Sequence, residues 1–280
     1  MRYQARNGIP ATGKLDRETL ASLNVPVQQR IDQIVANMER WRWLPRSFEQ
    51  SYIEVNSADS TLVVVDHGNV VLTSQVIAGK PATPTPIFSA TVVAVTVNPY
   101  WNIPAPIARN EIWPKERRHP GFMASQNIFV DATTGGLRQE PGPKNSLGYL
   151  KLEMPNRFAT YLHDTPARSL FARESRHFSH GCVRVEQILP LASWALAGNF
   201  ETTKEKLSQL IATGLNQKIS LDTPLPIYVL YWTAIANQDG TVGFRLDVYG
   251  RDAKLLAALA GQHTIGRLSL NQDCQAVTAG

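Results

Sequence analysis

One cysteine of this sequence lies in a setting suited to nucleophilic catalysis. Cys182 belongs to the segment Ser-His-Gly-Cys-Val-Arg at 179–184. Acyl transfer by cysteine needs a thiolate, a base that forms it, and donors for the oxyanion that develops on the substrate. Gly181 lets the backbone turn tightly and bring amide groups close to a substrate carbonyl. Arg184 adds a positive charge that favours the thiolate, so we predict that Cys182 is a nucleophile.

A second segment, Tyr-Leu-His-Asp-Thr-Pro at 161–166, supplies a candidate base. His163 ends a strand-like run nineteen residues before Cys182. This length lets the chain leave the strand, form a short helix at 167–172 and return beside the strand. Side chains on neighbouring strands approach to about 5 Å at Cβ. His180, two residues before Cys182 in the same segment, is held about 6–7 Å away at Cα if that segment is extended. We therefore predict that His163, rather than His180, is the base.

Cysteine usage narrows the remaining possibilities. The second cysteine, Cys274, lies in a polar tail and looks incidental. Two cysteines make neither a disulfide framework nor a four-ligand zinc site. Residue types alone leave open a metal site built from His163, His180 and Cys182, and a structural role for either histidine.

The composition is that of an ordinary globular protein. The chain has 280 residues, of which 43% are hydrophobic and 18% charged, so one large domain or two modest ones can form. A net charge of +5 suits an anionic polymer or serves solubility alone. The basic cluster at 109–118 is interrupted by Glu111, Pro114 and Glu116 and lacks the dense run of a nucleic-acid-binding tail. We expect no nucleic-acid partner.

No segment reads as a membrane anchor or an export signal. No run approaches the roughly 18 apolar residues of a spanning helix. The first residues, MRYQARNGIP, lack a long apolar core and a small-residue cleavage site. We expect any export signal or membrane anchor to lie outside this sequence.

From residue 51 the hydrophobic period is two, which is typical of β-strands. The strand-like runs are YIEV, TLVVVDH, VVLTSQVIAG and TVVAVTV, followed by 149–154, 159–164 and 226–232. His-Gly-Asn at 67–69 predicts a hairpin turn, and helices are expected at 186–198 and 201–214. The pattern predicts a mainly β, α+β domain with mostly antiparallel strands.

Two further segments differ from this β pattern. Residues 99–146 are rich in proline and contain two tryptophans, which indicates an inserted subdomain with helix around 106–124. Residues 2–24 predict a short helix, then an Asp16-capped helix with Leu20 and Leu23 on one face. Residues 27–43 have helical apolar spacing and predict a linker helix docked on the catalytic domain. The tail after about 262 is expected to be poorly ordered.

The cysteine motif carries a family resemblance. Residues 179–184, with the upstream His-x-Thr at 163–165, resemble the L,D-transpeptidase (YkuD-type) catalytic domain. The resemblance covers about residues 50–235. Further segments, at 79–86, 98–104, 138–148 and 163–186, are similar to a large periplasmic subgroup with an inserted capping subdomain and a peptidoglycan-binding module. That subgroup often has serine where His180 stands. Residues 2–24 resemble the C-terminal half of a peptidoglycan-binding repeat.

The resemblance implies a YkuD-like β-sandwich. Its implied domains are a partial peptidoglycan-binding-like module at 1–26, a linker helix at 27–50, the catalytic domain at 51–235 with the capping subdomain at 99–146, and a C-terminal extension at 236–280. It also implies roles for single residues. Cys182 is the nucleophile and His163 the base and later acid. The remaining roles are a tautomer-fixing backbone carbonyl (Asp164), oxyanion donors (the Tyr161 hydroxyl and the N–H groups of Gly181 and Cys182) and substrate contacts (Ser179, His180 and Arg184).

The implied reaction is transfer of a peptidoglycan stem peptide without metal or cofactor. The thiolate attacks the carbonyl between residue three and D-Ala of a tetrapeptide stem, and D-Ala leaves. The side-chain amine of a diaminopimelate residue resolves the thioester, which gives a 3→3 cross-link. The resemblance further implies binding to stem peptides and glycan, covalent inhibition by carbapenems, and a site in the periplasm or cell envelope. Two alternatives stay open: a cysteine L,D-carboxypeptidase or hydrolase of stems, and a non-catalytic wall-binding protein.

Overall fold

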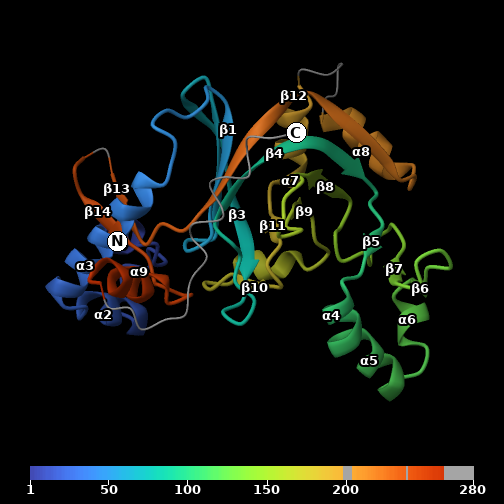
Figure 1. Cartoon of the computed structure of the whole chain (residues 1–280), viewed down its shortest axis with the longest axis horizontal. Helices are drawn as coiled ribbons and strands as arrows, with labels where there is room; N and C mark the ends of the chain where they lie inside the picture. Colours follow the sequence, from blue (N-terminus) through green and yellow to red (C-terminus); the bar gives the residue numbers. More distant parts are fainter. Residues whose placement is uncertain (198–203, 238, 262–280) are drawn as a thin grey trace. The chain divides into compact units, whose positions relative to one another are not determined.

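The computed structural model describes residues 1–197, 204–237 and 239–261, which form two compact units (Figure 1). One unit is residues 46–232, and the other combines residues 1–45 with the described residues from 233 onwards. No helix within these ranges is long and apolar enough to cross a membrane. Cys274 and the tail expected to be poorly ordered lie outside the described residues.

The larger unit is built on one nine-stranded sheet. Its strand order is β10-β3-β11-β9-β8-β4-β12-β1-β2, and β2 also pairs with β3, so the sheet closes on itself. Most pairs are antiparallel, but β1–β12, β3–β10 and β9–β11 are parallel. The α+β class is confirmed, with the expected sandwich taking the form of one strongly curled sheet. The strands are β1 (Tyr52–Asn56), β2 (Thr61–Asp66), β3 (Asn69–Gly79), β4 (Phe88–Val97), β8 (Leu150–Glu153), β9 (Leu162–His163), β10 (His177–Ser179), β11 (Val183–Val185) and β12 (Gln217–Leu230).

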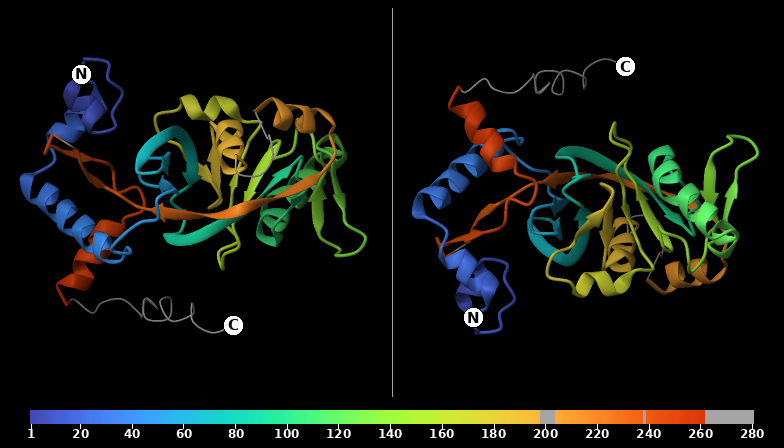
Figure 2. Two further views of the ribbon diagram at one scale, coloured as in Figure 1. Left: turned by 90° about the horizontal axis from the view of Figure 1, so that it is seen from above. Right: turned by 90° about the horizontal axis from the view of Figure 1, so that it is seen from below.

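Local sequence explains how this sheet is shaped. The predicted turn between β2 and β3 forms with His67 at φ 47° and Gly68 at φ 79°, the left-handed pair that suits a two-residue hairpin. Strand β12 begins at Gln217, earlier than predicted, and runs antiparallel along β4 for most of its length (Figure 2).

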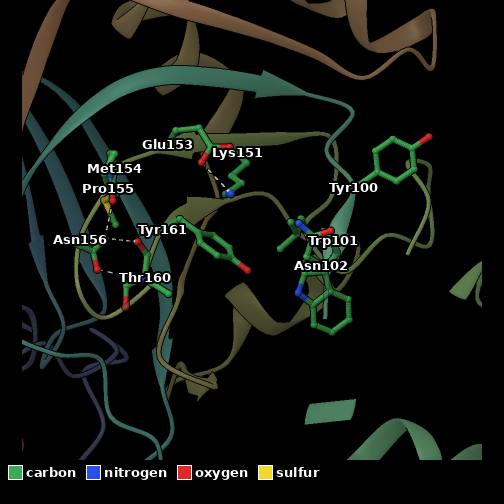
Figure 3. A pocket seen from close by; sticks show the side chains of 12 residues that line it. Tyr100, Trp101, Asn102, Lys151, Glu153, Met154, Pro155, Asn156, Thr160 and Tyr161 are labelled. Carbon is green, nitrogen blue, oxygen red and sulfur yellow. Dashed lines mark hydrogen bonds and ion pairs between the residues drawn. The ribbon is translucent and has the colours of Figure 1, made fainter. Parts of the chain in front are cut away.

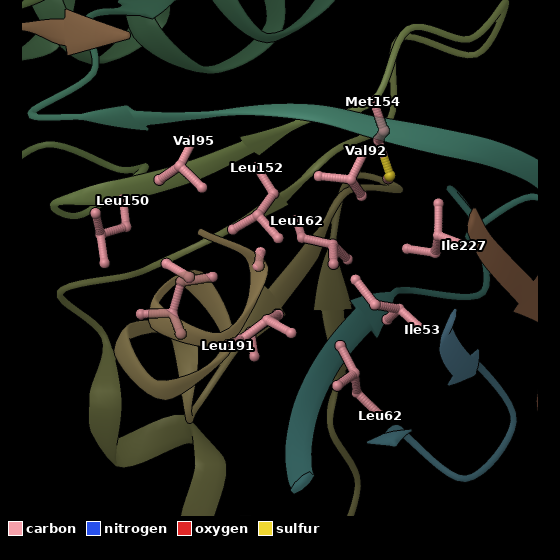
Figure 4. Packing of buried hydrophobic residues seen from close by; sticks show 14 of the residues in the cluster. Ile53, Leu62, Val92, Val95, Leu150, Leu152, Met154, Leu162, Leu191 and Ile227 are labelled. Atoms are coloured by element: carbon pink, nitrogen blue, oxygen red, sulfur yellow. The ribbon is translucent and has the colours of Figure 1, made fainter. Parts of the chain in front are cut away.

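The core fills the interior of the curled sheet. Alternate residues of the strands are buried there, and α7 (Ile188–Ala195) and α8 (Lys204–Ala212) contribute Leu191 and Leu207, both fully buried. Figure 4 shows Leu191 facing the side chains of Leu152 and Leu162 from strands β8 and β9. Strand β9, which carries the predicted base, and strand β11, which follows the predicted nucleophile, therefore both contribute to this core.

Residues 99–146 contain a small sheet and an apolar cluster that are separate from the main sheet and its core. The segment holds a three-stranded sheet, β5 (Trp101–Asn102), β7 (Leu137–Gln139) and β6 (Ile128–Val130), and the helical segments α4 (Ala105–Ile107), η1 (Ala108–Ile112), α5 (Trp113–Arg118) and α6 (Phe122–Ser125). A separate apolar cluster around Ile103, Ile112 and Leu137 stabilises it. Asn145, 1% exposed, donates to the carbonyls of Pro99 (2.9 Å) and Glu140 (2.8 Å), so it ties the beginning of the insertion to its end.

The smaller unit is discontinuous in sequence. It contains α1 (Arg2–Arg6), α2 (Arg17–Leu23), α3 (Val27–Arg42), β13 (Ala234–Ala236), β14 (Val242–Phe244) and α9 (Arg251–Leu259). The predicted cap of α2 is confirmed, because the Thr19 N–H donates to the Asp16 carboxylate at 2.8 Å. Arg40 of α3 forms a buried ion pair with Asp252 of α9 at 2.6 Å, so the N-terminal and C-terminal segments fold together.

The apolar stripe of α3 does not form its packing face in this unit. Ile31, Val35 and Met38 are exposed, and the buried residues are Ala36, Asn37 and Arg40. Periodicity misled here because the buried face is polar and satisfied: Asn37 bonds with Thr233, and Arg40 pairs with α9. Leu20 and Leu23 of α2 are likewise exposed.

Candidate active site

Strand register brings the two sequence motifs together. Strand β11 lies parallel to β9, with Arg184 opposite His163 and Val183 opposite Leu162. Opposed residues point to the same face of a sheet, so Val183 and Leu162 enter the core while Arg184 and His163 share the other face. The Val183 N–H donates to the Tyr161 carbonyl at 3.1 Å, which extends the pairing one step and sets Cys182 beside Tyr161.

Tyr161 and Ala159 surround the thiol. The Cys182 S–H donates to the Ala159 carbonyl at 3.9 Å, and the Tyr161 hydroxyl hydrogen bonds to the sulfur. Burial raises the pKa of Cys182 above its ordinary value, while the bonds from Tyr161 and the charges of Lys151 and Arg184 act in the opposite direction. Because burial dominates, the resting sulfur is a neutral thiol. The pKa of Tyr161 is also raised, chiefly by burial, so its hydroxyl stays protonated and can donate.

His163 is held in the orientation a base requires. Its Nδ1–H donates to the Asp164 carbonyl at 2.5 Å, since a carbonyl only accepts. Nε2 is then the atom available to take a proton. The imidazole is 4% exposed, and burial followed by the Arg184 charge lowers the pKa of His163 to about 3.

Asp164 also anchors the neighbouring turn through its carboxylate. The carboxylate accepts from the Tyr149 N–H at 3.0 Å and pairs with Arg168 at 3.2 Å. A Cβ at Gly148 would lie 2.3 Å from this carboxylate, and Gly148 has φ 62°, so only glycine fits there. The turn at Gly148 thus packs directly against Asp164, whose backbone carbonyl orients His163.

The loop before the cysteine is closed on itself by Ser179. Its hydroxyl donates to the Cys182 carbonyl at 2.5 Å and accepts the Gly181 N–H at 3.1 Å. Gly181 has φ 115°, a left-handed conformation that favours glycine. The Gly181 amide, expected as an oxyanion donor, is therefore occupied within the loop. Of the three donors predicted for the oxyanion, the Cys182 N–H and the Tyr161 hydroxyl remain.

A neighbouring segment, residues 79–85, braces the same loop. Thr85 is fully buried and donates to the Gly181 carbonyl at 3.0 Å, while the Gly79 N–H donates to Thr85 at 2.8 Å. Thr83 donates to the Ser179 carbonyl at 3.2 Å. A side chain on Gly79 would collide with the Thr83 carbonyl. The turn that presents the thiol is thus shaped from outside the cysteine motif.

This brace predicts a stability effect. Thr85→Val keeps the branched shape but leaves the Gly79 N–H and the Gly181 carbonyl without this hydroxyl. Losing a buried hydrogen-bond partner costs about 1–3 kcal/mol, so we expect the free energy of unfolding, measured in urea, to fall by about that amount. Thr83→Val, at a half-buried single bond, is the matched control and should cost about 1 kcal/mol or less. Equal losses would show that the Thr85 bonds carry no special weight.

His180 bonds to the inserted subdomain through Glu111. Its Nε2 lies 2.5 Å from the Glu111 carboxylate and 3.4 Å from the Lys80 ammonium. Arg184 instead stays on the reactive face, and its Nε is buried with no hydrogen-bond partner in the described part of the chain. Of the three predicted substrate contacts, Arg184 alone has this unmet capacity. Ser179 is buried within its loop, and His180 joins the loop to the insertion.

A cavity of about 320 Å³ lies beside Tyr161 (Figure 3). One wall comes from the inserted subdomain through Tyr100, Trp101 and Asn102, and the opposite wall is the loop at 154–160. Lys151 and Glu153 of β8 also line it. Sequence reasoning missed these two residues, because an alternating strand gives no signal that its polar residues face a cavity. No cluster of three or more His, Cys, Asp or Glu in the described ranges is arranged to hold a metal ion.

The electrostatics of the pair predict an unusual pH profile. A base must be neutral to accept a proton, and the lowered pKa of His163 keeps it neutral well below pH 6.5. The raised pKa of Cys182 keeps the thiol protonated through neutral pH. We expect the rate of thiol acylation to be nearly flat from about pH 5 to 8 and to fall only in stronger acid. An acid limb centred near pH 6.5 in stopped-flow measurements would contradict this electrostatic account.

Comparisons with known proteins give the class. The chain belongs to the L,D-transpeptidase catalytic-domain family, whose model matches residues 50–219. A candidate L,D-transpeptidase of Haemophilus influenzae is 31% identical over 267 residues, or 86% of this chain and 53% of the relative. The chain thus spans about half the length of that relative.

Solved structures with some likeness are also L,D-transpeptidases. A mutant of the Enterococcus faecium enzyme is 15% identical, with 65% of this chain and 50% of that one covered and a TM-score of 0.32. L,D-transpeptidase 3 of Mycobacterium tuberculosis, solved with a faropenem-derived adduct, is 15% identical, with 65% and 60% covered and a TM-score of 0.34.

Proposed function

We propose that this protein is an L,D-transpeptidase that forms 3→3 peptidoglycan cross-links through a thioester on Cys182. One observation carries the proposal: the thiol lies beside Tyr161, on the face of the sheet that His163 shares, and His163 has its Nδ1 fixed by the Asp164 carbonyl. Family membership supplies the reaction type. A cell-wall substrate also means that the enzyme acts in the periplasm or cell envelope.

In the first half-reaction the thiol attacks the carbonyl between residue three of a tetrapeptide stem and D-Ala. His163 Nε2 takes the thiol proton as the S–C bond forms. The Tyr161 hydroxyl and the Cys182 N–H donate to the oxyanion, a type of stabilisation worth about 2.7–4 kcal/mol per donor in other enzymes. The C–N bond then breaks, and His163 returns the proton to the departing amine of D-Ala.

In the second half-reaction the side-chain amine of a diaminopimelate residue attacks the thioester. Nε2 takes a proton from this amine, sulfur leaves, and His163 re-protonates it. The product joins residue three of one stem to residue three of another. If water attacks instead, the same site acts as an L,D-carboxypeptidase. Two features favour the amine: the reactive face is walled by the insertion, and His163 is nearly inaccessible to solvent.

Analysis of the products tests this function. The protein is incubated with a disaccharide tetrapeptide, and the products are separated and weighed by mass spectrometry. Release of D-Ala with a cross-linked dimer is the expected result. A trimmed tripeptide monomer alone identifies a hydrolase, and unchanged substrate identifies a non-catalytic protein. Because the acyl-enzyme forms on a thiol, carbapenems are further expected to acylate Cys182.

A further inference from the structure

The reactive face holds a cation that the mechanism above leaves without a role. Lys151 of β8 lies directly opposite His163, on the side away from Arg184. Its ammonium is 4.5 Å from the centre of the Tyr161 ring and lowers the pKa of the thiol. Figure 3 shows Lys151, Tyr161 and Trp101 around one cavity, and Tyr161 is also the residue that hydrogen bonds to the thiol. Lys151 is therefore placed to meet a ligand that extends from Cys182 into this space.

The position of this ammonium is fixed. Glu153 pairs with it at 2.9 Å and is itself held by the Thr96 hydroxyl at 2.9 Å. The side chains of Lys151 and Glu153 are only 20% and 27% exposed. An ammonium has three N–H donors, so pairing with one Glu153 oxygen leaves capacity for a second anion. The arrangement suits a carboxylate that enters the cavity.

The chemistry of the proposed reaction identifies that carboxylate. The nitrogen that leaves with D-Ala is the amine of an α-amino acid, and its carboxylate is one carbon away. The attacking amine of diaminopimelate is likewise attached to a carbon that bears a carboxylate. The first half-reaction breaks a C–N bond at the carbonyl carbon, and the second forms a C–N bond at the same carbon. The nitrogen that leaves and the nitrogen that attacks therefore occupy the same position. The carboxylates next to these two nitrogens reach the same group of the protein.

We propose that Lys151 binds the free α-carboxylate of the amino acid that leaves and of the amino acid that enters, and so selects α-amino acids as acceptors. This inference rests on the proposed function. It makes Lys151 a specificity-determining residue. Glu153 is a positioning residue that holds the ammonium over Tyr161. Arg184 lies across His163 and does not line the cavity.

The test compares two acceptors that differ only in the carboxylate. The enzyme receives a tetrapeptide donor with either D-methionine or D-methioninamide, and kcat/KM for each exchange product is measured by mass spectrometry. A charge-assisted hydrogen bond is worth roughly 10- to 100-fold. The ratio of kcat/KM for D-methionine to kcat/KM for D-methioninamide should therefore be larger by about that factor in the wild type than in the Lys151→Met variant. Comparing ratios between variants cancels the intrinsic difference in amine reactivity. Lys151→Arg keeps the charge and should retain the preference.

Lys254→Met is the matched control, because it removes the same charge from an exposed position on α9, in the smaller unit. Preference lost in Lys151→Met and kept in the control supports the inference. Preference absent in the wild type, kept in Lys151→Met, or lost in an Arg184→Met variant instead overturns it. If Lys151→Met does not fold, Lys151→Gln gives the same reading. Failure of the wild type to release D-Ala from the donor is a different result, which overturns the proposed function itself.

Discussion

Cys182→Ala is expected to abolish covalent modification by a carbapenem, while Cys274→Ala leaves it unchanged. The reason is local. Cys182 has a hydrogen-bonding phenol beside it, and it shares its face of the sheet with two cations and with an imidazole held by the Asp164 carbonyl. The wild-type protein should gain the mass of one inhibitor, and the Cys182→Ala protein should gain none.

Peptide mapping shows which cysteine carries the adduct. The adduct should reside on the peptide that contains Cys182, and circular dichroism of the variant should match the wild type. An adduct on Cys274, or one that survives the Cys182 change, would mean that the nucleophile has been assigned wrongly. Because Cys182 lies just before β11 rather than in the core, alanine should leave the sheet intact.

His163→Ala is expected to slow acylation by about 10²–10⁴, the usual contribution of a general base. The neutral imidazole is the group on the reactive face that can take the thiol proton, since Arg184 and Lys151 are already protonated. Stopped-flow measurement of acylation by a carbapenem gives the rate directly.

His180→Ser is the control for this change. The His180 Nε2 is engaged with the Glu111 carboxylate, so the serine variant should retain most of the rate. If His180→Ser is the slower of the two variants, His163 is not the base. The free energy of unfolding in urea is measured for both variants. A slow variant with an unchanged free energy of unfolding has lost the proton acceptor, whereas a lowered free energy indicates a loosened loop.

The sequence was enough to single out a candidate nucleophile and a candidate base, and the structure places them on neighbouring strands. A cysteine between glycine and arginine, and a histidine at a strand end nineteen residues earlier, had few other functions. The hairpin at 67–69 and the α2 cap were predictable for a similar reason, since each depends on residues within one turn of chain.

Features that depend on distant segments could not be predicted. The alternation of β8 marks Lys151 and Glu153 as outward residues, but only the insertion's position turns their side of the sheet into a cavity. The Gly181 amide is bonded to the Ser179 hydroxyl, and its carbonyl is held by Thr85 from a segment 96 residues earlier in the chain. The apolar stripe of α3 misled because its polar residues found partners more than 190 positions away.

The acyl-enzyme formed from a natural donor tests the central claim most directly. The protein is mixed with a tetrapeptide stem without an acceptor, quenched in acid within its first turnover and weighed intact. The account predicts a gain equal to the donor less D-Ala, on the peptide that contains Cys182 and removable by hydroxylamine, as a thioester is. Release of D-Ala with no adduct at any quench time, or an adduct on another residue, would contradict it.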